Sequence, residues 1–440
     1  MPESFLIRAR WVVPVEPAGA VLHDHVVAVR DARIEAVLPA AEASARFADR
    51  ATIELREHVL VPGFVNAHTH AAMALMRGIA DDLPLLRWLK EHIWPAEMRH
   101  VSPRFVHDGT LLACAEMLRG GTTCFNDMYF YPEAALDAAL ESGIRAALGM
   151  IVVEFASSYA SDPEDYLAKG LALRDRWRDH PQLAFCFAPH APYTVSDETF
   201  RRIAQLGGEV YAPVHIHLHE TEDEIERSVA EHGERPIERL HRLGLLGPGL
   251  IAVHAVHLSE EEIVLLARHG CSVVHCPSSN MKLASGFAPV ARLLQAGVNV
   301  ALGTDGAASN NRIDMMQEMR QAALLTKAVA RDAEAMPAHA ALRAATLSGA
   351  QALGLDQSLG SIVSGKWADL TAVRLTGPEL VPCYDPVSHL VYAAGREHVS
   401  DVWVGGKRLV ENGSLLNFGR FDLDMRGELW QNSLKTPPES

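Results

Sequence analysis

The stretch Val59-Leu60-Val61-Pro62-Gly63-Phe64-Val65-Asn66-Ala67-His68-Thr69-His70 decides the fold of this chain. Its apolar run predicts a buried strand that ends in two histidines. Because side chains alternate along a strand, His68 and His70 leave the same face and can share one ligand. Imidazole nitrogens bind zinc and related divalent metals well. The stretch therefore indicates a strand that supplies part of a metal site.

The same pattern recurs between Leu60 and Thr346, where short apolar strands alternate with helical stretches. Polar residues able to bind a ligand follow most of these strands: His190, His217, His254, His275 and Asp305. Repeated strand–helix units predict parallel strands joined by crossover helices. In a (β/α)₈ barrel the carboxyl ends of the strands form the catalytic face. We therefore predict an α/β protein with a (β/α)₈ TIM-type barrel rather than a doubly wound sheet.

Local signals support the helices and strands of this pattern. Ser102-Pro103 predicts the start of a helix that ends at Gly120-Gly121, and Ser259 with Glu262 forms a capping box. Both ends of the chain contain short β segments, and Gly405-Gly406 predicts a two-residue hairpin turn. We expect residues 1–58 and 370–440 to form a small β-sandwich module, and residues 59–369 to form the barrel.

Composition excludes several classes of protein. The 440 residues are 48% hydrophobic and 22% charged, which is typical of soluble globular chains. The net charge of −15 without a basic run argues against nucleic acid and membrane surfaces as partners. Six cysteines without a Cys-x-x-Cys pair indicate reduced thiols. No signal-peptide pattern or membrane span is evident, so we expect a cytoplasmic protein.

The strand ends together offer His68, His70, His217, His254 and Asp305. Three imidazoles and a carboxylate suit zinc, with iron or manganese as alternatives. The histidines at 215, 217 and 219 all point to one side of their strand, so spacing alone does not choose among them. His254 and His275 could instead be buried histidines that satisfy backbone groups. Asp305, within Gly303-Thr304-Asp305-Gly306, is poorly explained by packing and favours a functional role.

Glu220 follows the run of three histidines and has two interpretations. Beside an activated water, its carboxylate could take a proton and pass it to a leaving group. Alternatively, it is an acid that precedes the helix predicted from Glu222 to His232, where negative charge favours the helix dipole.

Several motifs together resemble the amidohydrolase superfamily. They are residues 62–70, the His217/Glu220 pair, His254-Ala255-Val256-His257-Leu258, Cys276-Pro277-Ser278-Ser279-Asn280, Leu302-Gly303-Thr304-Asp305-Gly306, and the segment from Gly360 to Leu370. Within the superfamily the chain is similar to the mononuclear-metal branch of aromatic deaminases and chlorohydrolases. The likeness is greatest to deaminases of 5′-methylthioadenosine and S-adenosylhomocysteine, through residues 76–83, Trp94-Pro95-Ala96-Glu97, Asp127-Met128-Tyr129, residues 189–193 and residues 305–310.

The resemblance implies a role for each matching residue. The metal ligands would be His68, His70, His217 and Asp305. Glu220 would shuttle protons with Asp305, and His254 would orient the attacking water. The remaining substrate contacts would be Glu97 to the ribose hydroxyls, His190 to the purine, and Trp88 and Ser309 lining the pocket. The resemblance also implies one divalent metal per subunit (Zn²⁺ above Fe²⁺ or Mn²⁺), a small purine nucleoside substrate and a homo-oligomer.

Four alternatives concern the chemistry of the site. Relatives that act on S-adenosylhomocysteine are expected to place arginines near its amino-acid carboxylate. Residues 146–173 contain no arginine, which favours a substrate with the apolar methylthio group over one with the homocysteine group. Deamination of a guanine-like or triazine ring is a second possibility, against which Glu97 favours a riboside. A binuclear centre needs a bridging lysine, and Lys169 is the only lysine between Glu91 and Met281. A non-catalytic scaffold with this fold would be free to lose the ligands that this chain retains.

Overall fold

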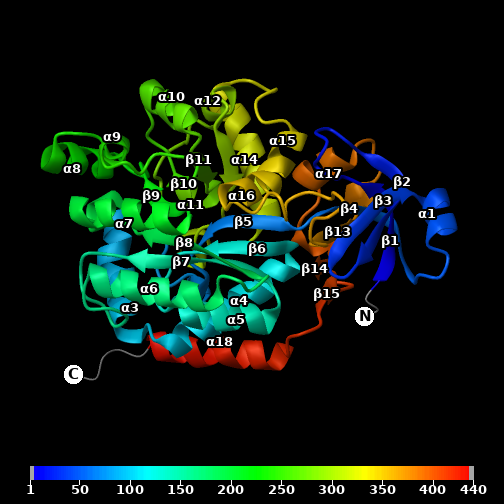
Figure 1. The fold of residues 1–440 in the computed structure, drawn as a ribbon, viewed down its shortest axis with the longest axis horizontal. Coiled ribbons are helices and arrows are strands. Elements are labelled where there is room, and N and C mark those ends of the chain that lie inside the picture. The colour runs from blue at the N-terminus through cyan, green and yellow to red at the C-terminus, as the bar shows by residue number, and fades with distance from the viewer. Residues whose placement is uncertain (1–3, 436–440) are drawn as a thin grey trace.

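A computed structural model describes residues 4–435, and two eight-stranded sheets organise them (Figure 1). The first sheet contains parallel strands in sequence order: β5 Phe64–Thr69, β6 Thr122–Asp127, β7 Arg145–Val152, β8 Leu183–Pro189, β9 Val214–Leu218, β10 Leu250–His254, β11 Ser272–His275 and β12 Asn299–Leu302. Just beyond β12, the Asp305 N–H donates to the carbonyl of His68 in β5 (3.1 Å). This bond joins the first and last strands of the sheet, and the predicted barrel is confirmed.

Helices and helical turns connect the barrel strands: η1 Ala71–Met76, α2 Leu85–Trp88, η2 Leu89–Ile93, α3 Trp94–His100, α4 Pro103–Arg119, α5 Pro132–Ser142, α6 Pro163–Trp177, η3 Pro192–Thr194, α7 Asp197–Val210, α8 Glu222–His232, α9 Pro236–Arg242, α10 Glu260–His269, α11 Pro277–Lys282 and α12 Val290–Gln295. Four further helices follow the last barrel strand: α13 Ala307–Asn310, α14 Met315–Ala330, α15 Ala338–Ala344 and α16 Leu347–Ala352. Ser102 caps α4 by accepting from the Phe105 N–H, and Ser259 with Glu262 caps α10. Both predicted helix starts are confirmed. Within the described residues, no helix is long and apolar enough to cross a membrane.

The second sheet combines both ends of the chain, as predicted. Its order is β16-β15-β14-β13-β4-β1-β2-β3, with β1 Ser4–Val12, β2 Leu22–Arg30, β3 Arg33–Pro39, β4 Thr52–Pro62, β13 Leu370–Arg374, β14 Val399–Val404, β15 Lys407–Glu411 and β16 Ser414–Leu415. Short helical elements accompany it: α1 Ala40–Arg46, η4 Pro378–Leu380, α17 Pro386–Tyr392 and η5 Arg396–His398. Gly405 and Gly406 turn β14 into β15 with φ of 53° and 72°, as a hairpin of this length requires. The division at 58/59 and 369/370 remains a prediction; β4 continues across the first position.

The last helix, α18 (Arg420–Lys435), differs from the expectation of a purely β terminal module. It lies along the barrel against α4 (Figure 1). The Trp430 ring packs edge-on against Phe105 with centroids 5.1 Å apart, and its indole N–H donates to the buried Asp108 carboxylate (2.9 Å). These contacts come from residues more than 300 positions apart, so a local sequence pattern does not reveal them.

A buried ion pair joins the barrel to the terminal sheet. Arg145, which begins β7, donates to both carboxylate oxygens of Asp369 (2.7 and 3.1 Å), and the Gly405 N–H donates to the same carboxylate. Arg145 lies at the amino end of its strand. The terminal sheet therefore joins the barrel at the end opposite to the histidine-bearing strand ends, which remain available for a site.

Candidate metal centre and substrate cavity

Three histidines and one aspartate converge at the carboxyl ends of the barrel strands. Asp305 Oδ1 lies 3.2 Å from His68 Nε2 and 3.3 Å from His70 Nε2. His217 Nε2 lies 3.2 Å from His70 Nε2. Ligand atoms of a tetrahedral zinc site with bonds of about 2.0–2.1 Å are separated by about 3.3–3.4 Å. These separations therefore fit a single divalent ion at the centre of the cluster.

Hydrogen bonds at the Nδ1 atoms of His70 and His217 strengthen this fit. Nδ1 of His70 bonds to the Met128 carbonyl, and Nδ1 of His217 bonds to the His190 carbonyl, both at 2.6 Å. A carbonyl only accepts, so each Nδ1 carries a proton, and the second nitrogen, Nε2, has a bare lone pair whenever the ring is neutral. Two lone pairs facing each other at 3.2 Å repel unless a cation lies between them. The arrangement therefore fits a metal site.

Two serines hold the aspartate in place. Ser279 and Ser309 both donate to Asp305 Oδ2 (2.6 and 2.7 Å), which leaves Oδ1 facing the histidines. Burial opposes ionisation of Asp305, but the hydrogen bond from His68 and the nearby imidazoles hold the pKa of this carboxyl well below its usual range. Asp305 is therefore an ionised ligand candidate. Its backbone φ of 61° is uncommon for a residue other than glycine. Such backbone conformations are found more often at functional sites.

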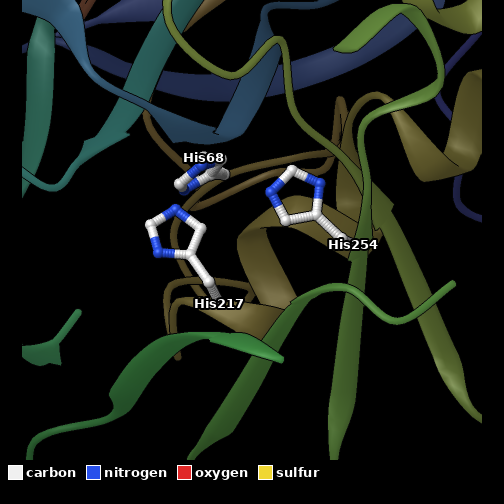
Figure 2. Close-up of side chains that lie close together, drawn as sticks. All are labelled: His68, His217 and His254. Carbon is white, nitrogen blue, oxygen red and sulfur yellow. The ribbon is translucent and has the colours of Figure 1, made fainter. Parts of the chain in front are cut away.

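His254 and Glu220 lie beside this cluster. The ring of His254 stacks on that of His217 with centroids 5.6 Å apart, and its ring nitrogen is close enough to those of His68 and His217 to form an alternative set of ligands (Figure 2). Its Nε2 lies 3.8 Å from Glu220 Oε2. Burial lowers the pKa of His254, but the carboxylates of Glu220 and Asp305 outweigh it and raise this pKa. Burial raises the pKa of Glu220, so this side chain can retain a proton.

Glu220 is oriented by residues that the sequence analysis did not single out. Ser285 donates to Glu220 Oε1 (3.2 Å). The carboxylate of Glu224, in the first turn of α8, accepts the backbone N–H groups of His219 and Glu220, both at 2.9 Å. Glu224 therefore satisfies the start of the helix, and Glu220 is left to face the cluster.

The two histidines of β9, and His219 directly after this strand, lie in different environments. His217 faces the cluster, and His215 lies behind His68 with its Nε2 2.9 Å from His68 Nδ1. His219 has a φ of 56° and turns away, where it bonds to the His257 carbonyl and the Ile237 N–H. The tertiary structure thus distinguishes residues that strand periodicity could not.

The cluster opens into a cavity of about 490 Å³. Nine of the ten predicted site residues line it: His70, Trp88, Glu97, His190, His217, Glu220, His254, Asp305 and Ser309. The tenth, His68, is fully buried behind them. Most of the other lining side chains are apolar or aromatic, and none of the lining residues is a lysine or arginine.

Glu97 is a partly buried acid that lines the same cavity. The Tyr129 hydroxyl donates to its Oε1 at 2.7 Å. Burial raises the pKa of Glu97 to about 7, although this hydrogen bond acts in the opposite direction. Tyr129 follows β6 in the Asp-Met-Tyr motif, and this position after a strand is the signal that could have identified it. The same holds for Ser279, which follows β11.

His190 and Trp88 complete the predicted substrate contacts. Burial lowers the pKa of His190 to about 3, so its ring is neutral, and Nδ1 lies 3.2 Å from the Thr194 hydroxyl. Trp88 is 5% exposed, and its indole N–H donates to the Ala80 carbonyl (3.1 Å). Its ring is thereby fixed in the wall of the cavity.

Comparison with known proteins agrees with this geometry. Residues 59–409 match the amidohydrolase family, and the chain belongs to that family. It is 47% identical to a 5-methylthioadenosine/S-adenosylhomocysteine deaminase from Teredinibacter turnerae over 98% of both chains. A protein of the same name from Saccharophagus degradans is 46% identical over 98% of this chain and 96% of its own. The solved structure of an adenosine deaminase from Xanthomonas campestris, with bound zinc, has 50% identity and a TM-score of 0.97, covering 98% of this chain and 99% of that one.

Proposed function

We propose that this protein is a zinc-dependent hydrolase that deaminates the adenine ring of 5′-methylthioadenosine, giving the inosine analogue and ammonia. The observation that carries the proposal is the cluster of His68, His70, His217 and Asp305 beside a cavity that is also lined by the partly buried acid Glu97. The names and the bound zinc of the similar proteins support it.

A zinc ion held by these four side chains would supply Lewis-acid chemistry that lowers the pKa of water from about 15.7 towards 7. Glu220 would carry one proton from the attacking water to the purine ring nitrogen. With Asp305 it would pass the second proton of that water to the amino group, which leaves C6 as ammonia. Ser285 holds one oxygen of Glu220, and the other lies towards His254. His254 donates from Nδ1 to the Asn280 side-chain oxygen (2.8 Å), which fixes its ring so that Nε2 can orient the water.

Glu97 would select ribosides. A carboxylate can accept both hydrogen bonds of a 2′,3′-diol, and Tyr129 holds Oε1 of Glu97 in a fixed orientation. His190 would contact the purine, with Trp88 and Ser309 lining the cavity around the nucleoside.

The lining of the cavity also favours the methylthio group at C5′. A homocysteine group carries a carboxylate and an ammonium, and burying either without a partner costs several kcal/mol. The carboxylate would find no lysine or arginine among the lining residues, whereas a methylthio group would be buried against apolar side chains. We therefore rank S-adenosylhomocysteine below 5′-methylthioadenosine.

A substrate panel tests this function. The zinc-loaded enzyme is assayed with 5′-methylthioadenosine, S-adenosylhomocysteine, adenosine and guanine, following loss of the substrate's absorbance and release of ammonia. We expect the highest kcat/KM for 5′-methylthioadenosine. Faster turnover of guanine would refute the role of Glu97. A purified protein with neither bound transition metal nor ammonia release would instead be the non-catalytic scaffold.

We also propose that zinc occupies the site in preference to iron or manganese, and that the protein is a cytoplasmic homo-oligomer. Metal analysis of protein purified without added metal tests the first statement. Light scattering tests the oligomer, since one chain has a mass of 48.0 kDa.

A further inference from the structure

The three histidines of the proposed metal site are oriented in two different ways. His70 and His217 donate from Nδ1 to backbone carbonyls. His68 is different because its Nδ1 lies 2.9 Å from Nε2 of the His215 side chain. A substitution does not remove a backbone carbonyl, whereas the partner of His68 is a side chain that a single substitution can replace. Dependence of the metal site on this orienting bond can therefore be measured at His215.

A metal in the proposed site would fix the proton positions along this pair. His68 Nε2, which faces Asp305 Oδ1 at 3.2 Å, would then offer its lone pair to the metal instead of a proton to Asp305. The single proton of a neutral His68 ring is then on Nδ1, and His215 Nε2 must accept it. Both rings have no exposed surface, with centroids 4.9 Å apart and planes 72° apart. In the part of the chain that the structure describes, no other hydrogen-bond partner of His68 Nδ1 is found.

We propose that His215 is a positioning residue for metal binding: by accepting from His68 Nδ1, it fixes the orientation and tautomer of the His68 ring. The proposal rests on the proposed metal site. Partners of this kind around metal ligands typically change metal affinity by about 10- to 100-fold when they are removed. His215 does not touch the metal or the substrate, since it lies behind His68 and does not line the cavity.

The test uses two substitutions of nearly equal size. H215Q keeps a side-chain oxygen that can accept from His68, whereas H215M has no comparable acceptor. A matched control is H275M, because His275 is equally buried but neither of its ring nitrogens has a hydrogen-bond partner. The zinc dissociation constant is measured by competition with a chromophoric chelator, and the cobalt-loaded proteins are compared by their absorption spectra.

We expect the zinc dissociation constant of H215M to rise about 10- to 100-fold, with an altered cobalt spectrum. H215Q should stay closer to the wild type, and H275M should match it. Wild-type affinity and an unchanged spectrum in H215M would overturn the proposal, as would equal losses in H215Q and H215M. Should H215M not fold, H215F takes its place in the same comparison. A wild-type protein that binds zinc but deaminates nothing would contradict the proposed function and leave this measurement intact.

Discussion

Replacing Glu97 by alanine should separate nucleoside recognition from the chemistry at the metal. The carboxylate of Glu97 can accept hydrogen bonds from the two hydroxyls of a ribose, although its Oε1 already accepts one from the Tyr129 hydroxyl. A hydrogen bond to a charged group contributes about 1.5–3 kcal/mol, so losing two removes about 3–6 kcal/mol. Since about 1.4 kcal/mol corresponds to a factor of ten, kcat/KM for 5′-methylthioadenosine should fall about 10²- to 10⁴-fold.

The assay compares 5′-methylthioadenosine with its 2′,3′-dideoxy analogue in the wild type and in E97A. The analogue cannot use Glu97, so its kcat/KM should change little on substitution. Zinc content should also be unchanged, because Glu97 is not among the proposed ligands. Y129F is the matched milder variant, since it removes only the hydroxyl that orients Glu97. Equal losses for the two substrates, or loss of zinc in E97A, would refute the reasoning.

Three further predictions follow from the same structure. Because burial raises the pKa of Glu97 to about 7, its carboxylate is protonated below that pH and accepts hydrogen bonds from the diol poorly. The KM for 5′-methylthioadenosine should therefore rise as the pH falls through about 7. The KM for the dideoxy analogue should show no such inflection. E220Q should retain zinc but lose about 10²- to 10⁴-fold in kcat, whereas E222Q, whose side chain is 80% exposed, should not; an active E220Q would contradict the proton-transfer role. R145A should lower the free energy of unfolding, measured in urea, by about 3–5 kcal/mol, because it leaves the buried Asp369 carboxylate without its arginine partner. R292A removes an exposed ion pair and should lower the free energy of unfolding by no more than about 1 kcal/mol. Equal effects would show that burial does not decide the contribution of these ion pairs to stability.

The sequence was sufficient for the features that depend on local spacing. Apolar strands alternating with capped helices predicted the barrel, since neighbouring parallel strands need a crossover helix between them. The position of His68 and His70 at the end of β5 placed them on the catalytic face, because that face is formed by the carboxyl ends of the barrel strands. Ser102 and Ser259 marked helix starts because their side chains bond to N–H groups only three residues away.

Other features depended on contacts between distant segments. Period-two alternation cannot distinguish His215, His217 and His219, and only their contacts with His68, His70 and His257 from other segments give each its environment. Ser279 reaches Asp305 from α11, and Tyr129 reaches Glu97 from the loop after β6. α18 was missed because its partners on α4 are more than 300 residues away.

The sequence by itself thus determined the barrel and the chemical types of the groups at its strand ends. The tertiary structure decided which nitrogen of each ring faces the proposed metal site, because that choice is made by contacts with carbonyls and side chains from other segments of the chain. It also placed His215, which strand periodicity could not distinguish from a ligand, against Nδ1 of His68.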